Sequence, residues 1–160
     1  MVSIIVAIAQ NGTIGDKNSL LWRIKEDMRF FRTTTSGHAV IMGRKTFESL
    51  GSKPLPKRTN IVITRADRSF DGALTAHSLD EAVAMAAGDE EIFVIGGAQI
   101  YAEALKSADR LYITRVYRDY EGDTAFPDIN LSEWRLVAEE RHERGEEYEY
   151  PFSFQTYDRA

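Results

Sequence analysis

Short apolar segments rich in β-branched residues alternate along this chain with segments of helical periodicity. Strands are expected over residues 3–9, 39–42, 60–64, 92–95, 110–117, 134–139 and 152–157, and helices over residues 25–34, 45–50, 79–87 and 98–106. The early strands are almost entirely apolar, as they are where helices cover both faces of a sheet. The last two are more polar and close together, which is typical of an antiparallel pair at an edge. The pattern therefore predicts an α/β fold, a mostly parallel sheet with antiparallel strands at its C-terminal end.

The composition is that of an ordinary globular protein, and it removes several kinds of site. With 160 residues, 43% of them hydrophobic, and no repeat or linker, we expect one domain spanning residues 1–160. The absence of cysteine excludes disulfide frameworks, thiolate zinc sites and cysteine nucleophiles, and it favours the cytoplasm. No apolar run approaches the ~18 residues of a membrane span, and the first ten residues lack the features of a signal peptide. We expect a cytoplasmic protein that does not enter a membrane.

Charge is distributed unevenly along the chain. The formal net charge is -5, yet the segment from Arg44 to Arg68 carries seven basic residues against two acidic ones, a local charge of +5. A compact basic segment in an acidic protein suggests a small anionic ligand and argues against nucleic acid as the partner. Two solvated surfaces of opposite charge explain the same pattern, so charge alone does not decide between these interpretations.

Asp27 is the first candidate for chemistry. Ile24, Met28 and Phe31 occupy positions i, i+4 and i+7 of one helical stripe, and Asp27 falls within that stripe. A carboxylate on the apolar side of a helix is partly desolvated, which raises its pKa and calls for a cationic or hydrogen-bonding partner. The alternative is that Asp27 has no functional role and lies in the first helical turn because the helix dipole favours a negative charge there.

Two strand-to-helix turns are candidates for phosphate binding, namely GRKT at residues 43–46 and GG at residues 96–97. Basic side chains at a helix N-terminus are unfavourable unless an anion lies there, and glycines let backbone N–H groups approach a phosphate closely. Two such turns suggest a ligand with two phosphates, such as a dinucleotide, although the G-x-G-x-x-G pattern is absent. Two tight turns with basic residues on the surface are the alternative.

Residues 10–24 form a loop of 15 residues without strong periodicity, a length at which a loop in a compact domain is usually functional or disordered. Its apolar members Ile14, Leu20, Leu21 and Trp22 argue against disorder. A lid that closes over a ligand and a packed surface loop both fit. The chain has no G-x-S-x-G or Walker A sequence, and its three histidines lack metal-ligand spacing, so we expect neither serine hydrolysis nor a metal site.

Seven segments share one order and spacing: IGDKNSLLW at 14–22, EDMRFF at 26–31, VIMGRKTFESLG at 40–51, PLPKRTNIVIT at 54–64, FVIGGAQIY at 93–101, LYIT at 111–114 and EGDTAFP at 121–127. With these segments the chain resembles the dihydrofolate reductase family from Ser3 to about Tyr157. The resemblance implies an eight-stranded sheet with four flanking helices, in a monomeric, monofunctional enzyme of the bacterial type. It also implies NADPH-dependent reduction of 7,8-dihydrofolate to tetrahydrofolate for one-carbon metabolism, with antifolate inhibitors as further ligands.

The resemblance assigns roles at the substrate site. Asp27 matches the family's active-site carboxylate, which holds the N3 and 2-amino edge of the pterin, and Thr114 matches the threonine that hydrogen-bonds this carboxylate. Arg58 matches the arginine that binds the α-carboxylate of the glutamate tail, for which a planar bidentate donor is suited. Leu20 and Trp22 complete the residues expected at the reacting centre. The walls of the folate pocket are expected to come from Ile5, Val6, Met28, Phe31, Leu50 and Ile95.

The resemblance also assigns the cofactor site. Arg44, Thr64 and Arg65 match the residues that contact the 2′-phosphate, which favours NADPH over NADH. His77 stands near a position where a lysine or arginine often assists, so cofactor affinity is expected to weaken as rising pH removes the charge of the imidazole. The family has a cis peptide between the two glycines at 96–97. The expected cofactor contacts are Ala7, Ile14, Gly15, Asn18, Leu20, Gly43, Arg44, Lys45, Thr46, Ile63, Thr64, Arg65, His77, Ile95, Gly96, Gly97, Ala98, Gln99, Ile100, Tyr101 and Thr124.

The implied reaction transfers a hydride from nicotinamide C4 to pterin C6 and requires a proton at pterin N5. No side chain of the expected pocket is placed to protonate N5 directly, so a water molecule is expected to deliver the proton. Asp27 would orient the pterin and favour its protonated form. The lid, with Leu20 against the nicotinamide, would exclude other water and hold the reactants close.

The chain departs from the family in its lid and near its substrate arginine. Leu21 and Lys25 replace two prolines, which loosens the unfolded chain and bears on lid closure and antifolate affinity. A one-residue insertion around Lys53 affects the placement of the Arg58 loop.

Two other functions remain open at this point. One is a reductase of similar fold that acts on another heterocycle, such as a pyrimidine intermediate of riboflavin synthesis. Asp27 together with Arg58 argues against it, since such substrates have no glutamate tail. The other is a nucleotide-binding module without catalysis, against which the combination of Asp27, Trp22 and Thr114 argues.

Overall fold

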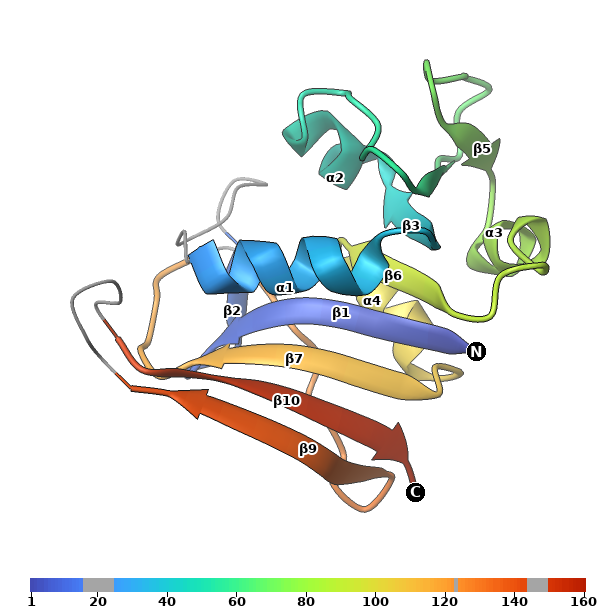
Figure 1. Cartoon of the computed structure of the whole chain (residues 1–160). Helices are drawn as coiled ribbons and strands as arrows, with labels where there is room; N and C mark the ends of the chain where they lie inside the picture. Colours follow the sequence, from blue (N-terminus) through green and yellow to red (C-terminus); the bar gives the residue numbers. More distant parts are fainter. Residues whose placement is uncertain (16–24, 123, 144–149) are drawn as a thin grey trace.

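The computed structural model describes residues 1–15, 25–122, 124–143 and 150–160, which form a layered α/β structure (Figure 1). The strands are β1 (Val2–Ala9), β2 (Thr13–Gly15), β3 (Ala39–Gly43), β4 (Thr59–Ile63), β5 (Leu74–Ala76), β6 (Ile92–Gly96), β7 (Arg110–Val116), β8 (Thr124–Ala125), β9 (Trp134–His142) and β10 (Phe152–Arg159). The helices in this part of the chain are α1 (Lys25–Thr35), α2 (Arg44–Ser49), α3 (Leu79–Met85) and α4 (Ala98–Leu105).

Eight strands form one sheet in the order β5-β4-β3-β6-β1-β7-β10-β9. Neighbouring strands are parallel, except that β10 runs antiparallel to both β7 and β9. The predicted mixed sheet with antiparallel C-terminal strands and flanking helices is therefore confirmed. The first strand lies inside the sheet, where Val2 pairs with Ile92 of β6 and Ser3 pairs with Arg110 of β7.

Three short strands have no counterpart in the sequence pattern. β2 and β8 form a separate antiparallel pair, and β5 extends the main sheet beside β4. Each is two or three residues long, and alternation over so few positions cannot be distinguished from an irregular segment. The expected loop over residues 10–24 therefore contains β2, and residues 16–24 of that loop lie outside the described part of the chain.

Successive residues of β1 point to opposite faces of the sheet and enter two separate cores. Ile4, Val6 and Ile8 belong to the larger core, which they share with residues of α3 and α4 such as Leu79. Ile5 belongs to the smaller core, against which the phenylalanines of α1 pack. Because both faces are covered, nearly every position of β1 is buried, which accounts for its continuous apolar sequence.

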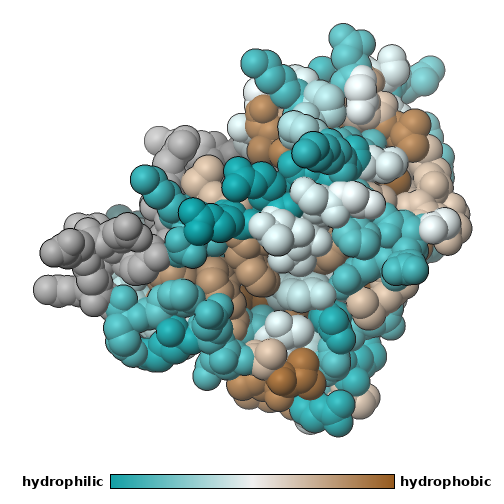
Figure 2. Space-filling view, in the orientation of Figure 1, coloured by the Kyte–Doolittle hydropathy of each residue, from teal (hydrophilic) through white to brown (hydrophobic). Residues whose placement is uncertain are grey.

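Helix α1 determines where Asp27 lies. Phe30, three residues further on, packs against Tyr112 and Phe154 with ring centroids 6.3 and 4.5 Å away, so Asp27 shares the side of the helix that faces the sheet. Met28 is 53% exposed, and the expected stripe through Met28 is wrong because aromatic packing at Phe30 sets the rotation of the helix. In the orientation of Figure 1, hydrophilic residues cover the outer side of α1 (Figure 2).

Candidate active site

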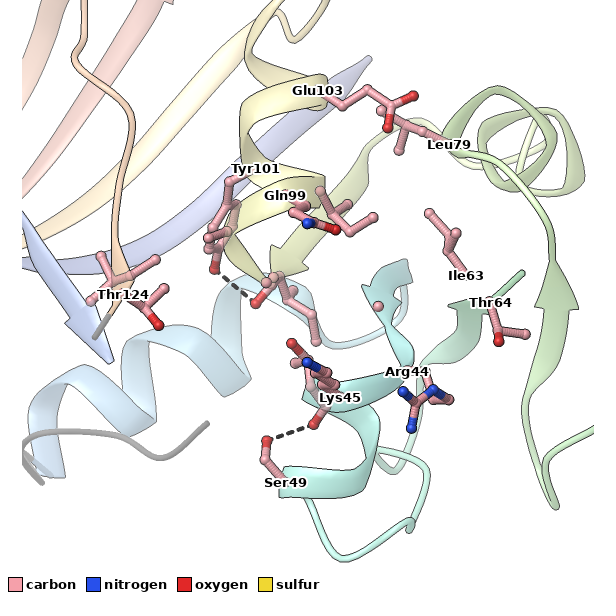
Figure 3. A pocket seen from close by; sticks show the side chains of 18 of the residues that line it. Arg44, Lys45, Ser49, Ile63, Thr64, Leu79, Gln99, Tyr101, Glu103 and Thr124 are labelled. Carbon is pink, nitrogen blue, oxygen red and sulfur yellow. Dashed lines mark hydrogen bonds between the residues drawn. The ribbon is translucent and has the colours of Figure 1, made fainter. Parts of the chain in front are cut away.

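A cavity of about 990 Å³ opens at the carboxyl-terminal ends of β1, β3, β4 and β6. Open parallel sheets bind ligands at this edge, because loops leaving neighbouring strands toward opposite faces diverge and leave a crevice. The chain passes from β3 into α2 and from β6 into α4, and these two helices begin on two sides of the cavity (Figure 3). The fold thus brings both predicted glycine turns to one place.

The two turns approach each other closely. Gly96 and Gly97 are joined by a cis peptide bond, and Gly96 has a φ of +137°. A Cβ at Gly96 would lie 3.2 Å from Thr46 Oγ1, and L side chains rarely adopt that φ, so the contact requires glycine. Neither α2 nor α4 has a side-chain hydrogen bond at its N-cap, which leaves the first backbone N–H groups of both helices for an anion. This arrangement suits a ligand with two linked phosphates.

Cationic and hydroxyl side chains gather at one end of the cavity. Arg44 from α2, Thr64 and Arg65 after β4, and His77 after β5 all line it. The His77 ring donates from Nδ1 to the carbonyl oxygen of Thr64 at 2.9 Å, which leaves Nε2 for a ligand. The guanidinium of Arg44 is paired with Glu48 in the next turn of α2. This end of the cavity suits a further anionic group.

Tyr101 forms a wall of the cavity near the middle of the sheet. Its buried hydroxyl lies 3.0 Å from the carbonyl oxygen of Ile5 and 2.7 Å from that of Ile95, so it bridges β1 and β6 (Figure 3). Burial and the negative charge of Asp27 raise the pKa of Tyr101, and the phenol therefore stays protonated at neutral pH. Tyr101 is a fixed wall of the cavity and not an acid–base group.

Asp27 does not line this cavity itself, but it lies close enough to Tyr101 for its charge to raise the pKa of that phenol. Thr114 on β7 donates from Oγ1 to Asp27 Oδ1 at 2.6 Å, the hydrogen bond that the resemblance implied. Thr114 pairs in the sheet with Ala7, which lines the cavity. Burial raises the pKa of Asp27, and the hydrogen bond from Thr114 opposes part of that rise. No cation among the described residues forms an ion pair with Asp27, so the carboxylate can accept hydrogen bonds from a ligand.

Arg58 lies against the C-terminal end of α1. Its Nε donates to the carbonyl oxygen of Pro56 at 2.8 Å and its Nη1 donates to Thr35 Oγ1 at 3.1 Å. These bonds hold the guanidinium over Phe31, with Cζ 5.9 Å from the ring centroid. Burial and the charge of Arg32 lower the pKa of Arg58, yet a guanidinium keeps its charge in a protein. Within the described ranges no acid pairs with it. It is available for a carboxylate.

Most of the expected cofactor contacts come together in the structure. Asn18, Leu20 and Trp22 lie outside the described residues, and Gly15 ends β2. The expected contacts that line the cavity are Ala7, Ile14, Gly43, Arg44, Lys45, Thr46, Ile63, Thr64, Arg65, His77, Ile95, Gly96, Gly97, Ala98, Gln99, Ile100, Tyr101 and Thr124.

The expected walls of the folate pocket fall into two groups. Ile5 and Val6 are buried in β1, and Phe31 of α1 is partly buried. Met28 and Leu50 are 53% and 38% exposed, so both belong to a rim and not to an enclosed wall. Their contact with a substrate remains a prediction.

Sequence reasoning missed several residues of the cavity, namely Ser49, Ala66, Ser78, Leu79 and Glu103. Ser78 has a sequence signal: it caps α3 by accepting a hydrogen bond from the backbone N–H of Glu81, the S-x-x-E spacing of a capping box. The others have no such signal, because they are ordinary residues of α2, α3, α4 and the segment after β4 that tertiary packing brings to one cavity.

The described ranges contain no group of three or more acidic or histidine side chains that could hold a metal ion. In the same ranges no helix has the length and apolar character needed to cross a membrane.

Comparison with known proteins gives consistent results. A family model described as dihydrofolate reductase matches residues 1–159. Dihydrofolate reductase of Bacillus subtilis (strain 168) is 44% identical over 160 residues, which cover 99% of this chain and 95% of that protein. Dihydrofolate reductase of Neisseria gonorrhoeae is 51% identical over 144 residues, 89% of this chain and 88% of that protein. The structure of dihydrofolate reductase from Enterococcus faecalis, complexed with NADP(H) and RAB-propyl, is similar with a TM-score of 0.92 and 37% identity, covering 99% of this chain and 96% of that one.

Proposed function

Because this chain belongs to the dihydrofolate reductase family, it is an NADPH-dependent oxidoreductase that reduces 7,8-dihydrofolate, and we propose how its own residues divide that reaction. Asp27 and Thr114 hold the pterin, Arg58 holds the glutamate tail, and the two glycine turns hold the cofactor's diphosphate. With the family shown, neither a reductase for another heterocycle nor a non-catalytic module is needed to explain the site.

The observation that carries this assignment is the partly desolvated carboxylate of Asp27, close to Tyr101 of the cavity wall. It has a hydrogen-bond donor in Thr114 but no cation, and burial raises its pKa. A pterin offers two N–H donors, at N3 and at the 2-amino group, to such a carboxylate. Two N–H···O bonds to one carboxylate fix a planar ring in both position and orientation.

The residues present also fit the cofactor. The cavity is large enough for a dinucleotide, glycines let the backbone approach a diphosphate, and Arg44, Thr64 and Arg65 supply donors at one end. Bound NADPH supplies the hydride. Tyr101 and Ala7 limit the space in which the nicotinamide can lie, which keeps hydride donor and acceptor near each other.

The proton for pterin N5 needs a different route. Among the described side chains near Asp27, Thr114 already donates its proton to the carboxylate and Tyr101 donates to backbone carbonyls. We therefore assign proton delivery to a water molecule. The ionised carboxylate of Asp27 favours the cationic, N5-protonated pterin electrostatically.

The direct test is to mix the purified protein with NADPH and dihydrofolate and to follow the loss of absorbance of the reduced nicotinamide. We expect turnover with NADPH and much weaker turnover with NADH. Binding of NADPH without any turnover would overturn the assignment of catalysis and leave only that of the cofactor site.

Replacing Arg44 with glutamine tests the assignment of the 2′-phosphate site. Loss of one charge-assisted hydrogen bond is expected to raise KM for NADPH by roughly tenfold, while KM for NADH changes little because NADH has no 2′-phosphate. Steady-state kinetics with both cofactors measures the ratio. Equal changes for NADPH and NADH would place Arg44 elsewhere.

His77 provides a second test of the same site. Its Nδ1 donates to the carbonyl oxygen of Thr64, so Nε2 is the ring nitrogen that remains for a ligand in the cavity. Replacing His77 with alanine should weaken NADPH binding by a few-fold, because the 2′-phosphate loses one polar contact. Titration of NADPH and NADH binding in wild type and His77→Ala measures it. Unchanged NADPH affinity in the variant would exclude His77 from the site.

We also propose that the protein works as a single-domain monomer in the cytoplasm. All of the described residues assigned to substrate and cofactor come from one chain, so no second copy is needed to complete the site. The absence of cysteine agrees with a reducing compartment.

A further inference from the structure

Thr35 is the last residue of α1, and its side chain is completely buried. Its Oγ1 donates a hydrogen bond to the carbonyl oxygen of Phe31, one turn earlier in the helix, at 2.7 Å. The same oxygen accepts a hydrogen bond from Nη1 of Arg58 at 3.1 Å. A hydroxyl whose proton is already donated presents its lone pairs in a fixed direction, so Arg58 is bonded to a defined point on α1.

The backbone that carries Arg58 is held by a different residue, Asn60, which is 3% exposed. Its Oδ1 accepts from the backbone N–H of Leu55 at 2.9 Å, and its Nδ2 donates to the carbonyl oxygens of Leu55 and Arg58 at 3.0 and 3.1 Å. These bonds place the loop and leave the direction of the guanidinium to its own hydrogen bonds. The bond to Pro56 lies within the same loop, so the bond to Thr35 is the one that relates the guanidinium to α1.

Helix α1 therefore connects the two groups that we assign to the ends of the substrate. Asp27, for the pterin, lies in its first turn, and Thr35, which bonds the group for the glutamate tail, is its last residue. The two positions are eight residues apart, which is about 12 Å along a helix that rises ~1.5 Å per residue. Because one hydrogen-bonded helix spans this distance, the separation of the two binding groups is set before the substrate arrives.

We propose that Thr35 is a positioning residue that fixes Arg58 relative to Asp27, and that the enzyme thereby selects substrates by the length between the pterin and the tail carboxylate. A substrate of matching length binds at both ends without reorganisation of the protein. The inference rests on the proposed assignment of Arg58 to the glutamate tail. It adds a selection by length to the recognition of each end.

Thr35→Val tests the positioning role, because it replaces the hydroxyl with a methyl group. KM for dihydrofolate should rise roughly three- to tenfold with kcat within about twofold of wild type, since one hydrogen bond of Arg58 is lost far from the reacting atoms. KM for a 7,8-dihydropterin that lacks the tail should not change. Thr35→Ala should give the same result, and Thr35→Ser, which keeps the hydroxyl, should restore KM to within about twofold of wild type.

Thr33→Val is the matched control, since it makes the same change at an exposed position of the same helix. Its KM for dihydrofolate should equal that of wild type. In Arg58→Gln, adding Thr35→Val should raise KM no further, because the group that Thr35 positions is already gone.

Substrate length gives a readout that a loss of stability alone would not move. The probe is an analogue of dihydrofolate with one extra methylene group between the pterin and the aminobenzoyl group. Wild type should bind this analogue roughly tenfold more weakly than dihydrofolate, because its two ends cannot meet both binding groups at once. In Thr35→Val the guanidinium can reorient towards the displaced carboxylate, so the ratio of the two dissociation constants should fall to about threefold or less. Both constants are measured by titration.

Three results would overturn the proposal: an equal rise of KM for dihydrofolate and for the dihydropterin in Thr35→Val, a further rise in the double variant, or an unchanged ratio of the two dissociation constants. Each would reduce Thr35 to a structural residue at the end of α1. If Arg58→Gln itself leaves KM for dihydrofolate unchanged, the assignment of Arg58 to the tail fails instead. The two failures are therefore distinguishable.

Discussion

Asp27→Asn is expected to lower the rate of hydride transfer at pH 7 by about 10²- to 10⁴-fold, the range in which a positioned acid–base or charged group contributes. The amide keeps the shape of the side chain and can still accept the hydrogen bond from Thr114. It loses the negative charge that favours a protonated pterin, and only one of its two atoms can accept from the ring. Single-turnover kinetics with saturating NADPH and dihydrofolate measures the hydride step separately from product release.

Glu26→Gln is the matched control, because the neighbouring carboxylate is paired with Arg29 on the same helix at 3.5 Å and faces no assigned ligand. Its hydride rate should remain near that of wild type. An Asp27→Asn rate within a factor of about three of wild type would remove Asp27 from the reacting centre, since it falls far below the ~10²-fold that such a group typically contributes.

Asp27→Asn should also stabilise the folded protein at neutral pH. Because the pKa of Asp27 is higher in the folded state than in the unfolded chain, the folded state binds more protons between the two values, and stability falls as pH rises through that interval. Above it, wild type bears the full cost of the desolvated carboxylate and the variant does not. The melting temperature of Asp27→Asn should therefore exceed that of wild type by a few degrees at pH 7, and the difference should disappear in acid.

Arg58→Gln is expected to raise KM for dihydrofolate by roughly 10- to 100-fold with a smaller effect on kcat, since it removes a charge-assisted pair to the tail carboxylate at a distance from the reacting atoms. The bonds to Pro56 and Thr35 hold the guanidinium in one plane in advance, so little ordering is required when the substrate binds. Steady-state kinetics should be repeated with a 7,8-dihydropterin that lacks the glutamate tail. KM for that substrate should be the same in Arg58→Gln and in wild type.

Arg32→Gln separates the effect of local positive charge on KM from that of the guanidinium of Arg58, which is held by its own hydrogen bonds. Arg32 is exposed, and its charge lowers the pKa of Arg58, so its removal changes the local field without removing the bonds of Arg58. Its effect on KM should be a few-fold and should shrink at high salt. If KM for the substrate without the glutamate tail rises in Arg58→Gln as much as KM for dihydrofolate does, then Arg58 acts through the fold of the pocket and not by binding the tail.

The long elements of the fold could be predicted because several local signals agree in each of them. β1 and β6 are apolar at nearly every position, and Gly43 and Gly96-Gly97 mark the points where strands give way to helices. The strands β2, β5 and β8 are held by pairing with distant segments, and two or three residues are too few to show the alternation of apolar and polar positions typical of a strand. Propensity and hydrophobic pattern are local signals, so they could not predict strands that depend on tertiary pairing.

The candidate site follows the same division. The glycine turns and Asp27 have chemical character that a sequence displays, so they could be selected in advance. Leu79 and Glu103 are ordinary residues of ordinary helices, and they meet only because α3 and α4 lie on the same face of the sheet. Apolar spacing predicts the wrong side of α1 for Met28, because spacing alone cannot decide between the stripe through Met28 and the one through Phe30.

The position of the first strand inside the sheet has a consequence for how the protein is made. β1 is synthesised before both of its partners, which are β6, where Ile92 pairs with Val2, and β7, where Arg110 pairs with Ser3. At ~5–20 residues per second, the intervening residues take roughly 5–20 s to synthesise. During that time a strand that is apolar on both faces has no neighbour on either edge, and it is open to association with other nascent chains. Yield in the cell should therefore depend on chaperones that shield Val2–Ala9, a cost of pairing this strand with partners that follow it so late in the sequence.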